Sequence, residues 1–223
     1  AGGRAKSQFL ANISHELRSP MHGILSYARF GLREWGTAEP PELRDYFQNI
    51  YDCGASLLEL LNDLLDLARL ESGRMKFEFD RVDLDEVLDS VLMEFDSLVQ
   101  ERGIQPVVRT GGNLSFVHAD RMRILQVVRN LLSNAVKFTP AGKTIEVATE
   151  SDARRVRVAV RNDGVGIPEE ELELIFDKFV QSSNTTSNAG GTGLGLAICR
   201  EILVAHGGWI WAENRAGGGM NII

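Results

Sequence analysis

The sequence predicts an all-α helical hairpin followed by an α/β sandwich that has a mixed sheet and helices on one face. Two observations support this prediction. Apolar side chains recur at helical spacing through the first 71 residues with one Gly- and Pro-containing break, and the rest of the chain alternates strand-like and helix-like stretches. A chain of 223 residues is long enough for two cores. We therefore expect a helical domain at residues 1–72 and an α/β domain at residues 73–223.

Charge and cysteine usage exclude several classes of function. The net charge is −7 and there is no long basic run, which argues against nucleic-acid binding. Cys53 and Cys199 lack the spacing of metal ligands, which argues against a zinc site and for a reducing compartment. No apolar run approaches the roughly 20 residues of a membrane-spanning helix. We expect this fragment to be cytoplasmic, and its residues leave open whether a longer protein is anchored in a membrane.

The first helix is predicted over residues 6–34, and it carries a histidine on its polar side. Its apolar stripe consists of Leu10, Ile13, Leu17, Met21, Ile24, Ala28 and Leu32. His15 points roughly away from this stripe, and a neutral imidazole is a competent nucleophile. Glu16 beside it can act as a base, and Pro20 should kink or loosen the helix just after the histidine. The alternative is that His15 belongs to an ordinary polar helix surface.

The second helix follows a break at residues 36–41 and extends to about residue 71. Its heptad-like apolar positions are Leu43, Phe47, Ile50, Leu57, Leu61, Leu64 and Ala68, with Gly54 as a further seam position. Leu58 and Leu65 widen the stripe beyond what a two-helix seam needs. Because one hairpin cannot cover so wide an apolar face, we predict that two hairpins pair into a dimeric four-helix bundle. The alternative is packing against the next domain of the same chain.

The α/β part is predicted from alternation, helix caps and turns. Asp83 begins a capping box that opens a helix to about residue 102, and Asp120 caps a long helix that ends at Phe138. Residues 181–191 are polar and without periodicity, and the stretch is long enough to form a mobile lid. The other predicted elements are strands at 75–79, 106–109, 144–150, 155–161, 209–213 and the chain end, and helices at 169–176 and 192–206.

Three segments of the α/β part predict a nucleotide site. One helix carries amides suited to Mg²⁺ and a lysine suited to phosphate on one face, namely Asn130, Asn134 and Lys137. Residues 162–166 (NDGVG) follow a strand, so a ligand ring can approach the glycines while Asp163 accepts from an exocyclic amine. Residues 190–196 (GGTGLGL) open a helix whose free N–H groups favour phosphate. Each segment by itself also fits an ordinary surface helix or turn.

The order of these motifs resembles the catalytic core of a sensor histidine kinase of the two-component systems, over the whole chain. The first 70 or so residues resemble the dimerisation and histidine phosphotransfer domain. The remainder resembles the Bergerat-type (GHKL) ATP-binding domain shared with the Hsp90, gyrase and MutL families. The matching motifs are the H box at 9–20 (FLANISHELRSP), the N box at 130–139 (NLLSNAVKFT), the G1 box at 163–168 (DGVGIP), the F box at 176–179 (FDKF) and the G2 box at 191–196 (GTGLGL).

The resemblance implies a phosphotransfer reaction on the first domain. His15 would accept the γ-phosphoryl group of ATP, with Glu16 as base, and pass it to an aspartate on the receiver domain of a response regulator. The implied partners are a second copy bound through the hairpin, the receiver domain, and an upstream sensory domain outside this chain. Ser19 stands where kinases with phosphatase activity more often carry Thr or Asn, so we expect a better kinase than phosphatase.

The resemblance also implies which residues bind ATP and Mg²⁺. Asn134, with Asn130, would hold Mg²⁺. Lys137 would contact phosphate, and Asp163 would bind the adenine amine. The other expected ATP-binding residues are Phe138, Gly164, Gly166, Ile167, Lys178, Thr192, Gly193, Leu194, Gly195 and Leu196. Two features depart from the family pattern: the predicted lid has no Arg or Lys, and Met220 stands where Ser or Thr is common.

Two other functions compete with this one. A degenerate kinase could act only as a nucleotide-binding regulatory or scaffold module, but the intact H, N, G1 and G2 motifs argue against it. An ATPase clamp related to Hsp90 or MutL would share the nucleotide fold, but it gives no reason for a heptad hairpin bearing His15. The stimulus, the cognate receiver, and transfer within one chain or across the dimer are beyond what these residues specify.

Overall fold

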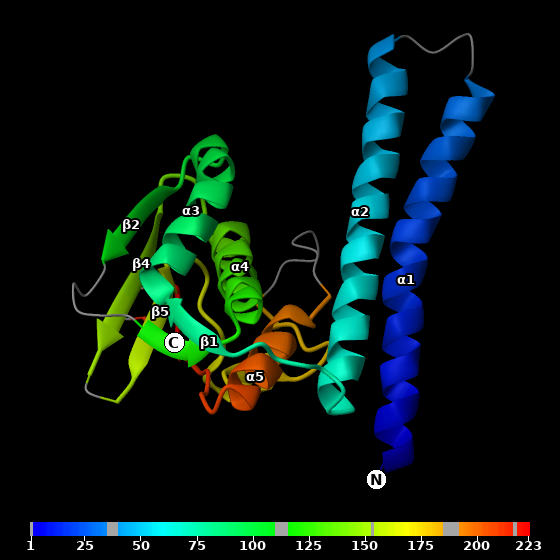
Figure 1. The fold of residues 1–223 in the computed structure, drawn as a ribbon. Helices are drawn as coiled ribbons and strands as arrows, with labels where there is room; N and C mark the ends of the chain where they lie inside the picture. The colour runs from blue at the N-terminus through cyan, green and yellow to red at the C-terminus, as the bar shows by residue number, and fades with distance from the viewer. Residues whose placement is uncertain (1, 35–39, 110–115, 153, 185–191, 216–217) are drawn as a thin grey trace. The chain divides into compact units, whose positions relative to one another are not determined.

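The computed structural model divides the chain into two compact units, Ala1–Ala68 and Arg69–Ile223, which are described separately (Figure 1). The structure describes residues 2–34, 40–109, 116–152, 154–184, 192–215 and 218–223, without the side chains of residues 2–12, 15 and 40. Most of the predicted break at 36–41 and of the predicted lid lies outside these residues. None of the described helices has a stretch long and apolar enough to cross a membrane.

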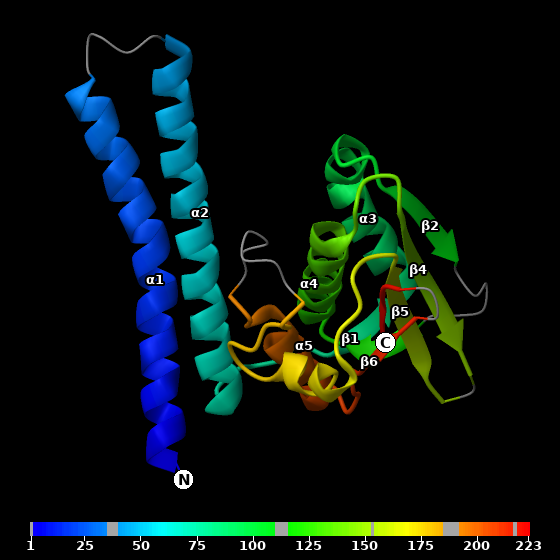
Figure 2. The same cartoon turned by 180° about the vertical axis from the view of Figure 1, so that it is seen from behind.

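The first unit is a hairpin of two long helices, α1 (Gly2–Arg33) and α2 (Pro40–Glu71). Figures 1 and 2 show the two helices side by side. Aromatic side chains join the end of α1 to the start of α2, because the Tyr46 ring centroid lies 6.4 Å from that of Tyr27 and 6.1 Å from that of Phe30. The predicted pair of helices, ending near residues 34 and 71, is confirmed.

Two residues of α1 show how the hairpin is built. At Gly23 the helices approach so closely that an added Cβ would lie 2.6 Å from Cys53 Sγ. A larger residue at this position would force the Cys53 side chain to move. Pro20 lies inside α1, where it removes one backbone N–H, and the helix nevertheless continues through it to Arg33.

The second unit contains a five-stranded sheet in the order β2-β4-β5-β7-β6. Its strands are β2 (Gln105–Arg109), β4 (Thr144–Ser151), β5 (Val156–Asn162), β6 (Ala212–Asn214) and β7 (Met220–Ile222). β2 is parallel to β4 and the other neighbouring pairs are antiparallel, so the sheet is mixed as predicted. In β4 the side chains of Ile145 and Val147 are buried whereas Glu146 between them is less so, which shows that one face carries the core.

β2 pairs on one side only within the described sheet, and a proline protects its outer edge. The Gln105 N–H donates to the Lys143 carbonyl (2.9 Å), so residues 105, 107 and 109 direct their N–H groups toward β4. Residues 106 and 108 face outward, and residue 106 is a proline, which has no N–H. The outer edge of β2 therefore offers only the Val108 N–H to another strand.

Three helices cover one face of this sheet: α3 (Leu84–Glu101), α4 (Arg121–Phe138) and α5 (Gly195–Ala205) (Figure 2). α3 contacts β2, α4 contacts β5, and α4 also contacts both other helices. The predicted caps are confirmed, because Asp83 accepts from the Asp85 N–H at the start of α3 and Asp120 begins α4.

Asp120 holds more than its own helix. Its Oδ1 accepts from the N–H groups of Met122 (3.0 Å) and Arg123 (3.2 Å), and its Oδ2 accepts from the Glu78 N–H (3.0 Å). Burial alone would raise the pKa of Asp120, but these backbone hydrogen bonds outweigh burial and lower the pKa below its usual value. The carboxylate therefore remains ionised while it joins the backbone at Glu78 to the start of α4.

His206, at the end of α5, completes this junction. Its Nε2 accepts from the Asp120 N–H (3.0 Å), and its Nδ1 donates to the Ile202 carbonyl (2.7 Å). These two partners fix the neutral ring in one tautomer. The rings of Phe77 and Phe79 pack against it, with centroids 5.2 Å and 4.8 Å away.

That packing explains a wrong prediction. Residues 75–79 do not form a strand: Phe77 packs on His206, and Phe79 packs on both His206 and His118. The strand lies just after them, at β1 (Asp80–Asp83), and pairs antiparallel with β3 (Phe116–Ala119), which the sequence analysis missed.

Three other predicted elements are shorter than expected. The helix predicted at 169–176 is two 3₁₀ turns, η1 (Glu169–Glu171) and η2 (Leu174–Phe176). The helix predicted at 192–206 begins only at Gly195, because Gly193 has a φ of +65°, outside the helical region. The strand predicted at 209–213 is assigned only from Ala212, although Trp211 already exchanges two backbone hydrogen bonds with Ile223.

We predict that Asp120→Ala lowers the free energy of unfolding by about 1–2 kcal/mol near neutral pH, because α4 loses its N-cap and the Glu78 N–H loses its acceptor. Asp120→Asn keeps an acceptor oxygen without the charge and is the control. Because the pKa in the folded state lies below 3.8, the charge stabilises the fold above pH 3.8 and stops doing so as the pH falls through the folded-state pKa. Urea unfolding over a pH series measures both effects, and equal midpoints for Asp120→Ala and the parent near neutral pH would contradict the prediction.

Candidate functional site

Three predicted motifs meet along the second half of α4. The Asn130 side chain donates through Nδ2 to the carbonyl of Gly195, the first residue of α5 (3.2 Å). At the end of α4, the Phe138 carbonyl lies against Gly164, where any Cβ would collide with it. The N box is therefore in contact with both the G1 turn and the G2 segment.

The polar face of α4 carries its predicted residues half-buried. Asn130, Asn134 and Lys137 are each neither fully buried nor fully exposed. The Lys137 ammonium lies over the Phe138 ring, 5.0 Å from its centroid. Because Asn130 uses its NH₂ group for Gly195, its amide oxygen is the atom that can act as an acceptor for a ligand.

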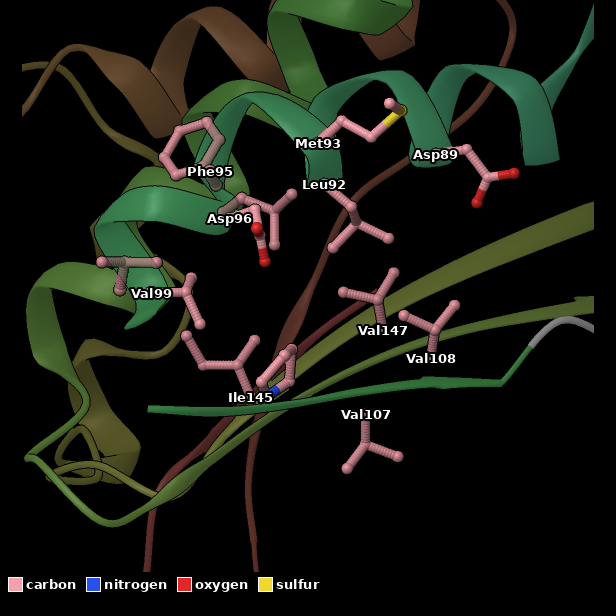
Figure 3. A pocket seen from close by; sticks show the side chains of 13 residues that line it. Asp89, Leu92, Met93, Phe95, Asp96, Val99, Val107, Val108, Ile145 and Val147 are labelled. Carbon is pink, nitrogen blue, oxygen red and sulfur yellow. The ribbon is translucent and has the colours of Figure 1, made fainter. Parts of the chain in front are cut away.

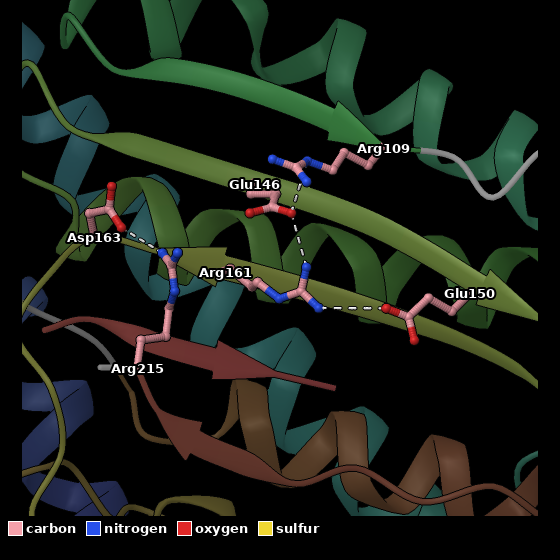
Figure 4. A network of polar contacts seen from close by, with 6 residues as sticks. All are labelled: Arg109, Glu146, Glu150, Arg161, Asp163 and Arg215. Atoms are coloured by element: carbon pink, nitrogen blue, oxygen red, sulfur yellow. Dashed lines mark hydrogen bonds and ion pairs between the residues drawn. The ribbon is translucent and has the colours of Figure 1, made fainter. Parts of the chain in front are cut away.

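The turn after β5, residues 163–167, is held from both sides. The Asp163 N–H donates to the Thr144 carbonyl (3.1 Å) in β4. Asp163 Oδ1 accepts from Arg215 Nη1 (2.5 Å), as Figure 4 shows. At the other end, the N–H and carbonyl of Ile167 both bond to the Asn214 side chain, at 2.9 Å and 2.6 Å. The backbone of this turn is thus fixed before any ligand binds.

Before α5, two residues in contact with each other, Phe179 and Gly193, both have positive φ angles. Phe179 has a φ of +62°, which is unusual for a residue with a side chain, and its N–H donates to the Gly193 carbonyl (2.9 Å). A Cβ at Gly193 would lie 2.8 Å from the Phe179 Cα. Thr192 Oγ1 accepts from the Leu194 N–H (3.2 Å), and no side chain caps the N-terminus of α5 at Leu194. The first N–H groups of α5, from Gly195 and Leu196 onward, are those that the sequence analysis assigned to phosphate.

The described part of the predicted lid contacts the G1 turn. Asn184 Nδ2 donates to the Gly166 carbonyl (2.9 Å), and the Ser183 N–H donates to Glu171 (3.0 Å). Residues 185–191, which include the rest of the lid, lie outside the described residues. Lys178, expected at the phosphates, follows η2 and is half-buried, and its role in ATP binding stays a prediction.

The predicted nucleophile lies in the other unit. His15 is in α1, but its side chain is outside the described part of the chain, so its predicted exposure stays a prediction. Glu16 is half-buried, and Ser19, one turn after His15, is exposed.

A second polar cluster, on the face of the sheet opposite the helices, is structural. Glu146 accepts from Arg161 (3.0 Å) and lies 3.3 Å from Arg109, and Arg161 also approaches Glu150 at 3.8 Å (Figure 4). Opposite charges alternate here across β2, β4 and β5, so they offset one another instead of forming a binding surface for one charge.

A cavity of about 510 Å³ lies between α3 and strands β2 and β4 (Figure 3). It is lined mainly by apolar side chains such as Leu92, Val108 and Val147, and its polar residues include Asp89 and Asp96. Two carboxylates would repel a triphosphate. The cavity contains none of the predicted nucleotide residues and is not the candidate site.

Sequence reasoning included Phe179 in the F box without giving it a role, and it missed Asn214 and Arg215. The positive φ of Phe179 has no signal in a residue type that normally avoids it. Asn214 and Arg215 lie some 50 residues from the turn they hold, which only the tertiary structure reveals. In the sequence they stand just before the run of three glycines at 217–219.

Comparison with known proteins supports the assignment of both units. The model described as the His Kinase A (phospho-acceptor) domain matches residues 5–73. The model described as the histidine kinase-, DNA gyrase B-, and HSP90-like ATPase matches residues 119–223. The chain is 39% identical over 231 residues to the sensor histidine kinase AruS of Pseudomonas aeruginosa and 34% identical over 227 residues to the histidine protein kinase DivJ of Caulobacter vibrioides. These matches cover 98% and 100% of this chain but only 22% and 37% of those two proteins.

Solved structures agree. The histidine kinase AdeS of Acinetobacter baumannii is similar with a TM-score of 0.75 and 26% identity, covering 93% of this chain and 95% of that one. The catalytic domain of the histidine kinase ThkA has a TM-score of 0.59 and 38% identity, covering 66% of this chain and 95% of that one. Both units are matched in order, and the motifs of the ATPase domain are in contact as described. The chain therefore belongs to the sensor histidine kinase family of the two-component systems, and it comprises that family's catalytic core.

Proposed function

We propose that this chain transfers the γ-phosphoryl group of ATP to His15 and then to an aspartate of a response-regulator receiver domain. The observation that carries the proposal is the contact of the N box with both glycine segments, through Asn130 to Gly195 and Phe138 to Gly164. A similar histidine kinase, ThkA, has been solved in complex with the response regulator protein TrrA, at 29% identity and a TM-score of 0.73. That complex supports a receiver domain as the partner here.

The nucleotide would bind between α4, the G1 turn and the start of α5. Asp163 would accept from the adenine 6-amino group, and Gly164 and Gly166 leave room for the base to approach the backbone. Thr192, Gly193 and the first N–H groups of α5 would contact the phosphates, where the helix dipole favours negative charge. The predicted lid would then exclude water from the triphosphate.

Mg²⁺ fits the donor set on α4. Among the described residues, no cluster of three or more His, Cys, Asp or Glu side chains is placed to hold a metal ion. The amide oxygens of Asn130 and Asn134, together with phosphate oxygens, form a ligand set that suits this hard cation. When bound, Mg²⁺ would offset the charge of the phosphates, and Lys137 would add a further positive charge nearby.

The transfer step uses side chains of the hairpin. A ring nitrogen of His15 would attack the γ-phosphorus, so that an N–P bond forms while the bond to the bridging oxygen breaks and ADP leaves. The imidazole loses its ring proton, and Glu16 is the proposed acceptor. Phosphoryl transfer depends mostly on positioning and charge neutralisation, which the ATP-binding unit would supply.

We also propose that two copies pair through the hairpin. Leu58, Leu61 and Leu65 on α2 are 60%, 42% and 56% exposed in a single chain. Met21 and Leu25 on α1 are exposed as well. A contiguous apolar stripe of this kind indicates a helix-packing surface. A dimer would cover it, and the match of residues 5–73 to the phospho-acceptor domain supports that interpretation.

The two competing functions have weaker support. A pure ATPase clamp does not account for the phospho-acceptor match over residues 5–73. A degenerate scaffold does not account for a complete set of motifs whose residues contact one another. An upstream sensory domain, and a domain division at residues 72 and 73, remain part of the proposal.

We predict that His15→Gln abolishes autophosphorylation and leaves ATP affinity within about twofold of the parent, because nucleophile and nucleotide pocket are in different units. His22→Gln, on the same helix, is the matched control and should label normally. Incubation with γ-labelled ATP and Mg²⁺, followed by acid and base treatment of the labelled protein, distinguishes an acid-labile, base-stable phosphohistidine from other products. Labelling of His15→Gln would refute the assignment, and release of phosphate without labelling of the parent protein would indicate an ATPase.

We predict that Asn134→Asp and Asp163→Asn fail in different ways. Asn134→Asp should reduce Mg²⁺-dependent turnover at least tenfold, because the metal ligand set is altered. Asp163→Asn should weaken ATP binding itself by about five- to tenfold, about 1–1.4 kcal/mol. Its amide oxygen would still bond to Arg215, which turns the NH₂ group toward the adenine amine. ATP titrations with and without Mg²⁺ separate the two, and identical defects would show that the roles are wrongly assigned.

We predict that Leu61→Glu with Leu65→Glu converts a dimer into a monomer, because each leucine contributes about 2 kcal/mol when buried in the interface. Met93→Glu is the control, since Met93 is 79% exposed on α3 of the other unit. Sedimentation velocity at micromolar concentration measures the change. A parent protein that is already monomeric there would contradict the proposed pairing.

A further inference from the structure

The end of β6 carries two adjacent side chains that hold both ends of the G1 turn. Asn214 Oδ1 accepts from the Ile167 N–H (2.9 Å), and Asn214 Nδ2 donates to the Ile167 carbonyl (2.6 Å). Arg215 Nη1 donates to Asp163 Oδ1 (2.5 Å), and Figure 4 shows the guanidinium directed at that carboxylate. One short segment therefore holds the first and the last residue of the turn.

The backbone of this segment is itself fixed. The Arg215 N–H donates to the Gly219 carbonyl (3.1 Å), and the Gly218 N–H donates to the Arg215 carbonyl (3.1 Å). Gly219 packs so closely on β5 that a Cβ there would collide with the Asn162 carbonyl oxygen. The backbone of Arg215 is thus held by hydrogen bonds to Gly218 and Gly219.

We propose that Arg215 is a positioning residue that sets the preference for a 6-aminopurine, acting through Asp163, while Asn214 holds the turn as a whole. The inference rests on the proposed role of Asp163 in binding the adenine amine. The Asp163 carboxylate has two oxygens. When Oδ1 bonds to Arg215, the carboxylate group is held in one orientation, and Oδ2 can then accept a hydrogen bond from a ligand in a fixed direction. A pre-oriented acceptor loses less freedom when the ligand binds, which increases affinity.

The ion pair between Arg215 and Asp163 is partly accessible to water. The side chains of Arg215 and Asp163 are 31% and 36% exposed. Pairs this accessible to water contribute little to the stability of a fold. Asn214, by contrast, bonds to the backbone of Ile167, so its loss should shift the turn whatever base is bound.

Two ligands separate these roles in the full chain: ATP, and purine riboside triphosphate, which lacks the 6-amino group. The parent should bind ATP more tightly. Arg215→Met should weaken ATP binding about five- to tenfold and leave binding of the analogue unchanged, so that most of the preference is lost. Asn214→Ala should weaken binding of both ligands by a similar factor. Affinities are measured by calorimetry without reliance on catalysis.

Arg157→Met is the matched control, because Arg157 is also an exposed arginine paired with a carboxylate, 3.6 Å from Glu150 on β4, but far along the sheet from the turn. It should change neither affinity. Thermal unfolding checks that Arg215→Met remains folded. Urea midpoints near that of the parent for both arginine variants support a role in binding, whereas a much lower midpoint for Arg215→Met overturns it.

Four binding results would overturn the inference. Tighter ATP binding by Arg215→Met would show that the guanidinium competes with the base for Asp163. Equal weakening of both ligands would show a general attraction of Arg215 to the triphosphate. A full 6-amino preference in Arg215→Met would show that Asp163 needs no orientation by Arg215, while the proposed function stands. If the parent itself does not distinguish the two ligands, the adenine role of Asp163 fails and the inference fails with it.

Discussion

The Asp120 carboxylate is the interaction on which the arrangement of the ATP-binding unit depends. It is buried, and it accepts hydrogen bonds from the start of α4 and from the segment that precedes β1, while its own N–H is bound by His206 at the end of α5. Such a group is costly to bury unless its charge is satisfied, and here backbone N–H groups satisfy it. The rotation and height of α4 follow from this junction. The polar face with Asn130 and Asn134 is therefore positioned by an aspartate about three turns away.

The second consequence of that junction concerns glycine. With α4 fixed at its start, its last carbonyl, that of Phe138, lies against Gly164, and its middle is tied to Gly195 by Asn130. At Gly164 the Phe138 carbonyl excludes a Cβ, whereas at Gly195 a Cβ would be in ordinary contact with Asn130. Gly164 thus serves packing within the unit as well as space for a ligand.

The elements that could be predicted are those whose stabilising contacts join residues close together in the sequence. Asp83 and Asp120 were recognised as caps because a cap satisfies N–H groups two or three residues away. The strand predicted at 75–79 was wrong, because alternation cannot distinguish phenylalanines within a strand from Phe77 and Phe79 packing on the ring of His206 from an irregular segment. β3 is four residues long and pairs with a strand 36 residues earlier, so no local signal marks it. The same limit hid Arg215, whose partner Asp163 is 52 residues away.

The proline in β2 has a meaning beyond the single chain. In the proposed dimer, two paired hairpins would each carry one ATP-binding unit. The two units would then be at a high effective concentration relative to each other. An open strand edge with regularly spaced N–H groups would then be a template for joining the two sheets into one. Pro106 removes one of the two outward N–H groups of β2 and leaves only that of Val108. With a single outward N–H group, the edge of β2 is a poor template for a second strand.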